Sequence, residues 1–508
     1  MKKRAQIPDS YTYSALFNGL TTNHNTANVG RRAQQLWDSL NSPTSKVKPS
    51  ILLTNAALKA CANAGHMDAL WAIAGAIPDS GKEAANSITY TTILNAMRFS
   101  TELEPRSEAT EEQAVALKTA VAQGRQIWAD VISRWTTAKL TLDEDLVCAM
   151  GRLLLASQRA QDWDDVFQLC LQTMNVPRAS PSLEVRDRTH NPRNINQLPP
   201  PFLRSDRTLE TAPQDISTTT GQEFRAIKLS NKGVWVKASN RTLTLLMETC
   251  QKMFLPKAAS QYWKMLTQGH GMDYQVKPDS ASCHAYLRML RQSKSSSEAL
   301  RFVRDEMQHE QSAAKTFRIA MSTCVRNQYS PNAMREATEL MDIMLNRLRA
   351  VDIKTGTMYM KLALSSPHMQ DTLVALGYVT PRKTNLWELL KSTSQHELDD
   401  VAELGRQVIS GYDRIMTTRV YSEKSGGFED YMKRKAAWTY AVQRSINGGK
   451  RSPPVLSDEE RMLIAKKKAL SRFERMKQRN NIRAKRSKSR IVDVPSDGPQ
   501  MAKLEMDV

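Results

Sequence analysis

The most strongly charged stretch of the chain is residues 461–490, whose side chains could bind phosphate groups. It holds thirteen Lys or Arg residues and one acid, Glu474, within a chain of 508 residues whose net charge is +20. Lysine and arginine neutralise phosphates and release the counterions that surround a nucleic acid. The candidates for phosphate contact are Lys466, Lys467, Lys468, Arg472, Arg475, Lys477, Arg479, Arg483, Lys485, Arg486, Lys488 and Arg490.

The same stretch has two other interpretations. A basic run is also typical of a solvated, disordered tail or of a nuclear localisation signal. Apolar residues such as Leu470 and Phe473 interleave with its first half. An amphipathic helix that lies on an acidic membrane surface is therefore a third interpretation.

No pattern in the chain predicts catalysis or a metal site. There is no glycine-rich phosphate loop, no G-x-S-x-G motif, no metal-binding His pair, and no C-x-x-C pair among the six cysteines. The acidic clusters at Asp143–Asp145 and Asp399–Asp400 are expected to cap helices and interact with their dipoles. We expect no enzyme, no cofactor, no metal and no small-molecule substrate, and we interpret the cysteines as core thiols.

The elements that position these side chains are predicted to be helices. Hydrophobic residues make up 41% of the chain but aromatic residues only 6%, and methionine is frequent, which favours helices over sheets. No apolar run approaches the roughly 18 residues of a membrane span, so we expect no transmembrane segment. The basic balance favours a polyanion, an acidic membrane surface or an acidic partner.

A recurring pattern divides much of the chain into similar units. Val276–Leu290 (VKPDSASCHAYLRML) opens with Pro-Asp and continues as an amphipathic helix, and Ile7–Leu20 and Val47–Cys61 open in a similar way. Half of the cysteines lie six residues after one aligned position, which favours a repeat over coincidence. The residues at that aligned position are Ser14, Asn55, Thr91, Cys148, Thr244, His284 and Arg318.

These units resemble the pentatricopeptide repeat (PPR) family, in which two antiparallel helices are followed by a loop that often ends in Pro-Asp or Pro-Asn. The best matches to its opening pattern are Thr12, Tyr13, Leu16, Phe17, Thr89, Tyr90, Ile93 and Leu94. The resemblance covers roughly residues 1–178 and 240–350. It implies an all-α, right-handed superhelical solenoid of helix-turn-helix repeats, with a helical C-terminal region and a disordered basic tail.

The pattern also predicts how the chain is divided. Residues 179–239 are proline-rich and cannot continue a solenoid, so they form either a disordered linker or an extended strap. In the third unit, Thr101–Glu112 is expected to be a surface loop and Gly124–Trp135 the second helix. The predicted parts are 1–178, a first PPR block; 179–239, the linker or strap; 240–350, a second PPR block; 351–450, a helical region in which the motif is no longer recognisable; and 451–508, the basic tail.

The resemblance implies which residues would meet RNA. In the family, unpaired bases lie along the first helices, one per repeat, and are read by the aligned residue and by the last residue of the loop. It implies the pairs Ser14 with Ser50 (purine), Asn55 with Asn86 (pyrimidine) and Thr244 with Asp279 (guanine). Cys148 with Arg178, His284 with Ala313, and Arg318 depart from the usual polar choices. The base-reading candidates are Ser14, Ser50, Asn55, Asn86, Thr91, Thr244, Asp279, His284 and Arg318, and the alternative is that they are only exposed helix positions.

The implied function is non-catalytic, sequence- or structure-selective binding of single-stranded RNA in mitochondrial RNA metabolism: processing, stability or translation of a transcript or a ribosomal RNA. Within the family, the chain looks most like fungal mitochondrial members, which implies a location in the mitochondrial matrix. The same likeness implies a role in small-subunit rRNA maturation, with the mitoribosomal small subunit as a partner. The alternative is a protein-interaction scaffold, such as a mitoribosome-associated factor, because other repeat families use the same helical hairpins.

Two further expectations depend on this resemblance. In an RNA-binding repeat protein, phosphate contact becomes the favoured interpretation of residues 461–490. Met1–Asp9 resembles the end of a preceding repeat. We therefore expect sequence upstream of Met1, so the lack of a visible targeting peptide carries no information about location.

Overall fold

Helical periodicity and capping side chains together account for the regular structure of the chain. The computed structural model describes residues 8–22, 26–43, 45–101, 111–181, 222–224, 235–269, 275–307, 313–391, 394–417 and 426–446. All regular secondary structure within these ranges is helical, which confirms the predicted all-α class. The chain forms two units, Met1–Thr384 and Asn385–Val508.

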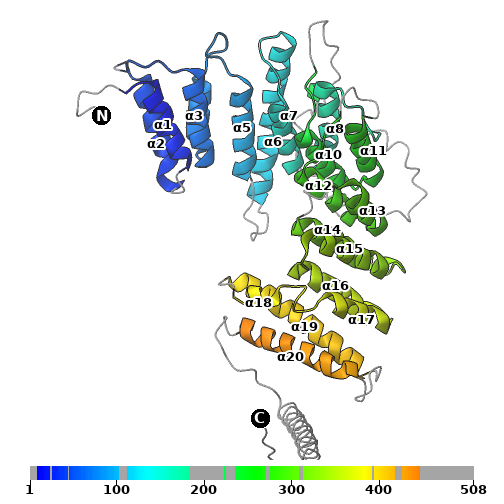
Figure 1. Cartoon of the computed structure of the whole chain (residues 1–508). Helices are drawn as coiled ribbons and strands as arrows, with labels where there is room; N and C mark the ends of the chain where they lie inside the picture. The colour runs from blue at the N-terminus through cyan, green and yellow to red at the C-terminus, as the bar shows by residue number, and fades with distance from the viewer. Residues whose placement is uncertain are drawn as a thin grey trace, which may run out of the picture. The chain divides into compact units, whose positions relative to one another are not determined.

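The first unit consists of successive helical hairpins, coloured from blue to yellow-green in Figure 1. Its helices are α1 (Ser10–Thr22), α2 (Thr26–Asn41), α3 (Ile51–Asn63), α4 (Met67–Gly75), α5 (Ser87–Thr101), α6 (Glu111–Thr136), α7 (Glu144–Ala156), α8 (Ala160–Met174), η4 (Gln222–Phe224), α10 (Asn240–Met253), α11 (Pro256–Gln268), α12 (Ser280–Gln292), α13 (Ser296–Arg301), η5 (Phe302–Glu306), α14 (Ala314–Arg326), α15 (Ala333–Leu348), α16 (Ile353–Ser365) and α17 (Met369–Tyr378).

One helix of each hairpin packs against its counterpart in the next. We call α1, α3, α5, α7, α10, α12, α14 and α16 the first helices, and α2, α4, α6, α8, α11, α13, α15 and α17 the second helices. Each first helix contacts its own second helix and the first helix of the following hairpin, from α1 through to α16. The row continues from α7 to α10, so the proline-rich stretch does not divide the hairpins into two blocks.

A side chain at an equivalent position caps the N-terminus of almost every first helix. Asp9 Oδ1 accepts a hydrogen bond from Thr12 N at 2.8 Å, and Asp279 Oδ1 accepts one from Ser282 N at the same distance. Such a cap satisfies a backbone donor that the helix leaves free, and its loss costs about 1 kcal/mol. Only Ala313, before α14, lacks a capping side chain at this position. The capping residues are Asp9, Ser50, Asn86, Asp143, Ser239, Asp279 and Asp352.

Apolar packing joins neighbouring hairpins. Phe167 on α8 stacks on Tyr262 of α11 with ring centroids 5.4 Å apart, and Trp263 stacks on Tyr286 of α12 at 4.8 Å. Between α7 and α10 the backbones approach closely, since a Cβ on Gly151 would lie 2.6 Å from Leu245 Cδ2. These contacts remove large aromatic and aliphatic surfaces from water, which is the main stabilising term in a helical array.

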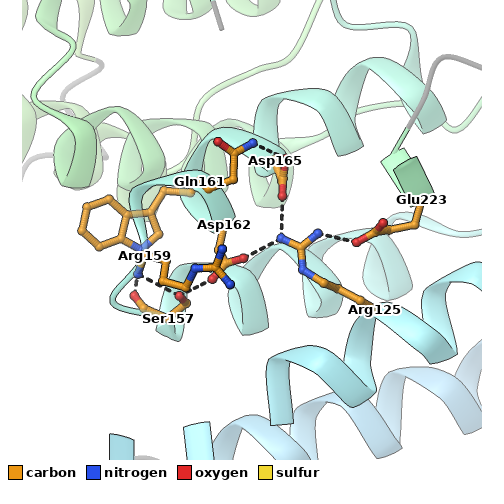
Figure 2. Close-up of polar contacts among 8 residues, drawn as sticks. Arg125, Ser157, Arg159, Gln161, Asp162, Asp165 and Glu223 are labelled. Carbon is orange, nitrogen blue, oxygen red and sulfur yellow. Dashed lines mark hydrogen bonds and ion pairs between the residues drawn. The ribbon is translucent and has the colours of Figure 1, made fainter. Parts of the chain in front are cut away.

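The described residues of the proline-rich stretch pack on the hairpins as a strap rather than leaving them. Figure 2 shows Arg125 of α6 reaching Asp162 and Asp165 of α8 and Glu223 of η4, and each carboxylate forms an ion pair with it. Phe224 is fully buried beside the same guanidinium, and Arg125 Cζ lies 5.1 Å from the centroid of the Phe224 ring. We call these four charged residues the Arg125 cluster. It holds η4 against α6 and α8.

Several predicted boundaries differ from the structure. Helix α6 begins at Glu111 rather than Gly124, because the residues before Gly124 are good helix formers and continue the same helix. The loop predicted at Thr101–Glu112 lies mostly outside the described residues, and its two ends are helical. A further hairpin, α16 and α17, follows Asp352, where the motif was no longer recognisable. The helical C-terminal unit therefore begins at Asn385 rather than residue 351.

The second unit contains α18 (Leu386–Leu389), α19 (Gln395–Thr417) and α20 (Gly426–Ile446). Helices α19 and α20 pack along each other around the fully buried Trp438. A Cβ on Gly405 of α19 would lie 2.3 Å from Val442 Cγ2, so only glycine permits this approach. Across the part of the chain that is described, every helix is too short or too polar to cross a bilayer.

Candidate nucleic-acid interface

Each first helix presents one residue at the same place, five residues after its capping position. We call this set the register residues: Ser14, Asn55, Thr91, Cys148, Thr244, His284, Arg318 and Thr357. All but Thr357 were aligned from the sequence. Because the first helices pack side by side, the register residues of neighbouring hairpins form one row. Their contacts run from one hairpin to the next.

Asn55 and Asn86, predicted as a reading pair, do meet. Asn55 Nδ2 donates to Asn86 Oδ1 at 3.2 Å, and the Thr89 hydroxyl donates to Asn55 Oδ1 at 2.7 Å. Asn86 Oδ1 also accepts from Thr89 N at 3.0 Å, so it caps α5 at the same time. The second N–H of the Asn55 amide makes no hydrogen bond to any described residue. The pair is thus fixed in orientation and retains a donor.

The other two predicted pairs are not joined by a hydrogen bond. Ser50 and Asp279 cap α3 and α12 instead, which is a structural role. Ser14 and Thr244 are half-buried and make no hydrogen bond to a described residue. The hydroxyl oxygen of Thr91 is buried and also lacks a partner there. These three side chains therefore keep their hydrogen-bonding capacity, whereas the loop residues largely do not.

Besides Asn55, three register residues form contacts with the next hairpin. His284 Nε2 lies 2.9 Å from the Thr316 hydroxyl, and burial, together with nearby positive charges, lowers the pKa of His284. Arg318 Nε donates to Asp352 Oδ2 at 2.8 Å. Cys148 Sγ lies 3.9 Å from the hydroxyl of Thr242. Polar atoms of these three side chains are therefore engaged within the protein.

Exposed apolar side chains accompany the first three register residues. Tyr11, Leu52 and Ile88 each lie three residues before the register residue of α1, α3 and α5, and they are 78%, 72% and 55% exposed. A single exposed apolar residue needs no explanation, but a recurrence once per hairpin at one register does. Apolar and aromatic faces of this kind are where unpaired bases stack.

Arginines lie further along the first helices, on the face that carries the register residues. Arg152 and Arg288 are four residues after a register residue, Arg98 and Arg291 seven, and Arg326 eight, spacings that keep side chains on one helix face. Arg152, Arg288, Arg291 and Arg326 form no ion pair or hydrogen bond with a described residue. Burial lowers the pKa of Arg291, and the charges of Arg326 and Arg288 act in the same direction. We call these five residues the arginine surface.

A carboxylate, Glu248 of α10, lies within the arginine surface, four residues after Thr244. Burial raises the pKa of Glu248, and the nearby positive charges of Arg152, Arg288, Arg98 and Lys252 oppose that rise. One acid among this many guanidinium groups leaves a strong excess of positive charge. Such a surface attracts a polyanion and offers donors with bidentate geometry for phosphate oxygens.

The acidic clusters and the cysteines have structural environments. Asp143 caps α7, while Glu144 Oε1 accepts from Ser239 N at 2.8 Å and from the Thr242 hydroxyl at 2.6 Å at the start of α10. All six cysteines are buried, and burial raises the pKa of Cys61 to about 11 and that of Cys148 to about 12. Across the described ranges, no cluster of His, Cys, Asp and Glu could hold a metal ion.

The predicted phosphate contacts in residues 461–490 lie outside the described residues, so they stay a prediction. Sequence reasoning assigned all phosphate binding to that stretch and missed the arginine surface. A signal was present, because Arg152 and Arg288 recur four residues after the aligned position. Comparison with known proteins gives no assignment: no family model matches the chain, and neither does any curated protein.

Proposed function

We propose that the chain is a right-handed helical-repeat solenoid that binds single-stranded RNA along its first helices, without catalysis. The observation that carries this proposal is the recurrence, in each of the first three hairpins, of an exposed apolar side chain three residues before a polar one, as at Tyr11 and Ser14 and at Leu52 and Asn55. An unpaired base offers a face that stacks on the first and an edge that hydrogen-bonds to the second.

The charge of the same face supports RNA as the ligand. Arg152 and Arg288 lie on the first helices without carboxylate partners among the described residues, and guanidinium groups bind phosphate oxygens well. The basic residues 461–490 would add phosphate contacts in the same complex. Following the family resemblance, the proposed setting is the mitochondrial matrix, and the proposed ligand is a transcript or the small-subunit ribosomal RNA.

Binding of a labelled single-stranded RNA pool to the purified full chain, measured by fluorescence anisotropy over a salt series, tests the proposal. We expect affinity to fall steeply with salt, and Arg152→Ala with Arg288→Ala to weaken it and to reduce the slope of log affinity against log salt by about 2. Arg335→Ala removes the same type of charge from the exposed face of second helix α15 and serves as the matched control.

The rival function is a protein-interaction scaffold, in which Tyr11, Leu52 and Ile88 would contact another protein. A chain that binds no RNA, or that loses as much affinity on Arg335→Ala as on Arg152→Ala, would contradict the RNA proposal. A stable protein complex isolated without RNA enrichment would favour the scaffold.

A further inference from the structure

The row of first helices is not uniform along its length. In the first three hairpins the position three residues before the register residue is apolar and exposed. In the fourth and fifth hairpins the same position holds Asp145 and Arg241, which form an ion pair with each other. The sixth, seventh and last hairpins carry Ala281, Lys315 and Lys354 there. A stacking surface for bases is therefore present only on α1, α3 and α5.

The register residues differ less sharply. Ser14 and Thr91 make no hydrogen bond within the described residues. Asn55 keeps one N–H without an acceptor there, although Asn86 and Thr89 of the following hairpin engage the rest of its amide. In the fourth, sixth and seventh hairpins the following hairpin also engages the register residue: Thr242 contacts Cys148, Thr316 contacts His284, and Asp352 contacts Arg318. An engaged side chain would have to lose a protein contact before it could hydrogen-bond to a base, which opposes binding.

The arginine surface lies mainly on the later hairpins, and Arg98 on α5 is its one member in the first three. Four residues after the register residue, the first three hairpins carry Asn18, Lys59 and Asn95, whereas the fourth and sixth carry Arg152 and Arg288 and the fifth carries Glu248. Arg291 and Arg326 extend the charge to the seventh hairpin. Contacts from such groups to phosphates position a nucleic acid but carry no direct sequence information.

We infer that the chain uses its hairpins in two ways, and this inference rests on the proposed function. The first three hairpins read bases, and the fourth to seventh hold the RNA backbone regardless of sequence. The ligand class is an RNA with a short specified element of roughly three unpaired nucleotides, one per reading hairpin, next to a segment of any sequence. Thr244 of the fifth hairpin makes no hydrogen bond to a described residue, but the residue three positions before it is Arg241 rather than an apolar one. We therefore assign the fifth hairpin to the part that holds the RNA backbone.

Selection from a random RNA pool, followed by sequencing and affinity measurement, tests the division on the full chain. Leu52→Ala with Ile88→Ala should flatten the enrichment of the selected motif while keeping most non-specific affinity. Both side chains are largely exposed, so the variant should fold, and Ser14→Ala provides an independent change in the same part. Arg152→Ala with Arg288→Ala should lower affinity about tenfold or more for all sequences and leave the motif unchanged.

The outcomes separate the two proposals. No RNA binding by the unaltered chain would overturn both. The selected motif could instead change in the Arg152→Ala, Arg288→Ala variant or in the Thr244→Val variant. That result would overturn the division of the hairpins but leave the proposal of RNA binding intact. The division would also be overturned by a motif that survives both Leu52→Ala with Ile88→Ala and Ser14→Ala, or by binding without any motif.

Discussion

Asn55 Nδ2 donates a hydrogen bond to Asn86 Oδ1 at 3.2 Å, which links first helix α3 to the start of first helix α5. Asn86 thereby has two functions, because the same oxygen caps α5 by accepting from Thr89 N. The pair shows how a residue that a base could contact is fixed by the cap of the next hairpin. At this position, the same amide groups therefore stabilise the fold and orient the side chain that we propose contacts a base.

Asn86→Ala should lower the free energy of unfolding by roughly 1–2 kcal/mol, because it removes both a cap and a buried acceptor. Urea denaturation followed by circular dichroism measures this loss. In a double-mutant cycle with Asn55→Ala, we expect a coupling of about 1 kcal/mol. Additive effects of the two substitutions would show that the hydrogen bond does not form in solution.

The Arg125 cluster should make stability depend on pH. One guanidinium faces three carboxylates, and burial raises the pKa of Asp165 from 3.8 to about 6 despite the ion pair with Arg125. The folded chain therefore holds this proton more tightly than the unfolded chain does. Protonated Asp165 therefore contributes roughly 3 kcal/mol to the free energy of unfolding below about pH 4. This stabilisation is lost as the pH rises through about 6.

Asp165→Asn should remove this dependence, so that the free energy of unfolding changes less between pH 4 and pH 7 than in the unaltered chain. Equilibrium denaturation at a series of pH values measures the difference. Arg125→Met, which leaves three buried carboxylates without their partner, should cost about 3–5 kcal/mol at neutral pH. An Asp165→Asn variant whose pH profile is the same as that of the unaltered chain would disprove the assignment.

Thr91→Val should separate stability from binding. The Thr91 hydroxyl oxygen is buried without a hydrogen-bond partner among the described residues, and valine has the same shape. Its replacement should raise the free energy of unfolding by about 1 kcal/mol and leave RNA affinity unchanged, because a bound base cannot reach the buried oxygen. Thermal unfolding and competition binding measure the two effects. A destabilised variant would mean that the hydroxyl has a partner in solution.

Glu248→Gln should strengthen RNA binding. The carboxylate lies among Arg152, Arg288 and Arg98, where it repels phosphates and offsets their charge. For charges about 4 Å apart in the dielectric of bulk water, removing one such charge is worth about 1 kcal/mol, or roughly fivefold in affinity. Asp68→Asn, on the exposed face of second helix α4, is the matched control. Equal affinities for the two variants would place Glu248 away from the bound RNA.

Local patterns predicted the hairpins well. Cys61, Cys250 and Cys324 were aligned from the sequence alone, and each is fully buried on a first helix. The predicted second helix Gly124–Trp135 likewise lies within α6 (Glu111–Thr136). Both successes depend on the 3.6-residue period, which is visible within a few turns of helix. The capping role of Ser50, Asn86 and Asp279 was not predicted, because these residues were interpreted as base-reading positions.

Contacts between distant residues were not predictable in this way. Glu144 accepts from Ser239 and Thr242, almost a hundred residues later, and Arg125 pairs with Glu223 across a similar separation. No periodic pattern connects such positions. The hairpin of α16 and α17 was missed because its cap, Asp352, follows no proline and the opening Thr-Tyr pair is absent.

The candidate interface was predictable in part. Alignment located the register residues, but only coordinates distinguish the free hydroxyl of Thr91 from the engaged imidazole of His284. Exposure could not be read from the sequence either, since Ile88 is exposed whereas Ile93, on the same helix, is buried. The arginine surface depends on the packing of the first helices from α5 to α14, which brings its members together.

Crosslinking of RNA to the full chain, with mass-spectrometric mapping of the modified peptides, tests the central claim most directly. The account predicts crosslinks on the first helices, above all at Tyr11, Leu52 and Ile88 and next to Arg152 and Arg288. Crosslinks confined to the second helices, or none in the first unit, would contradict it.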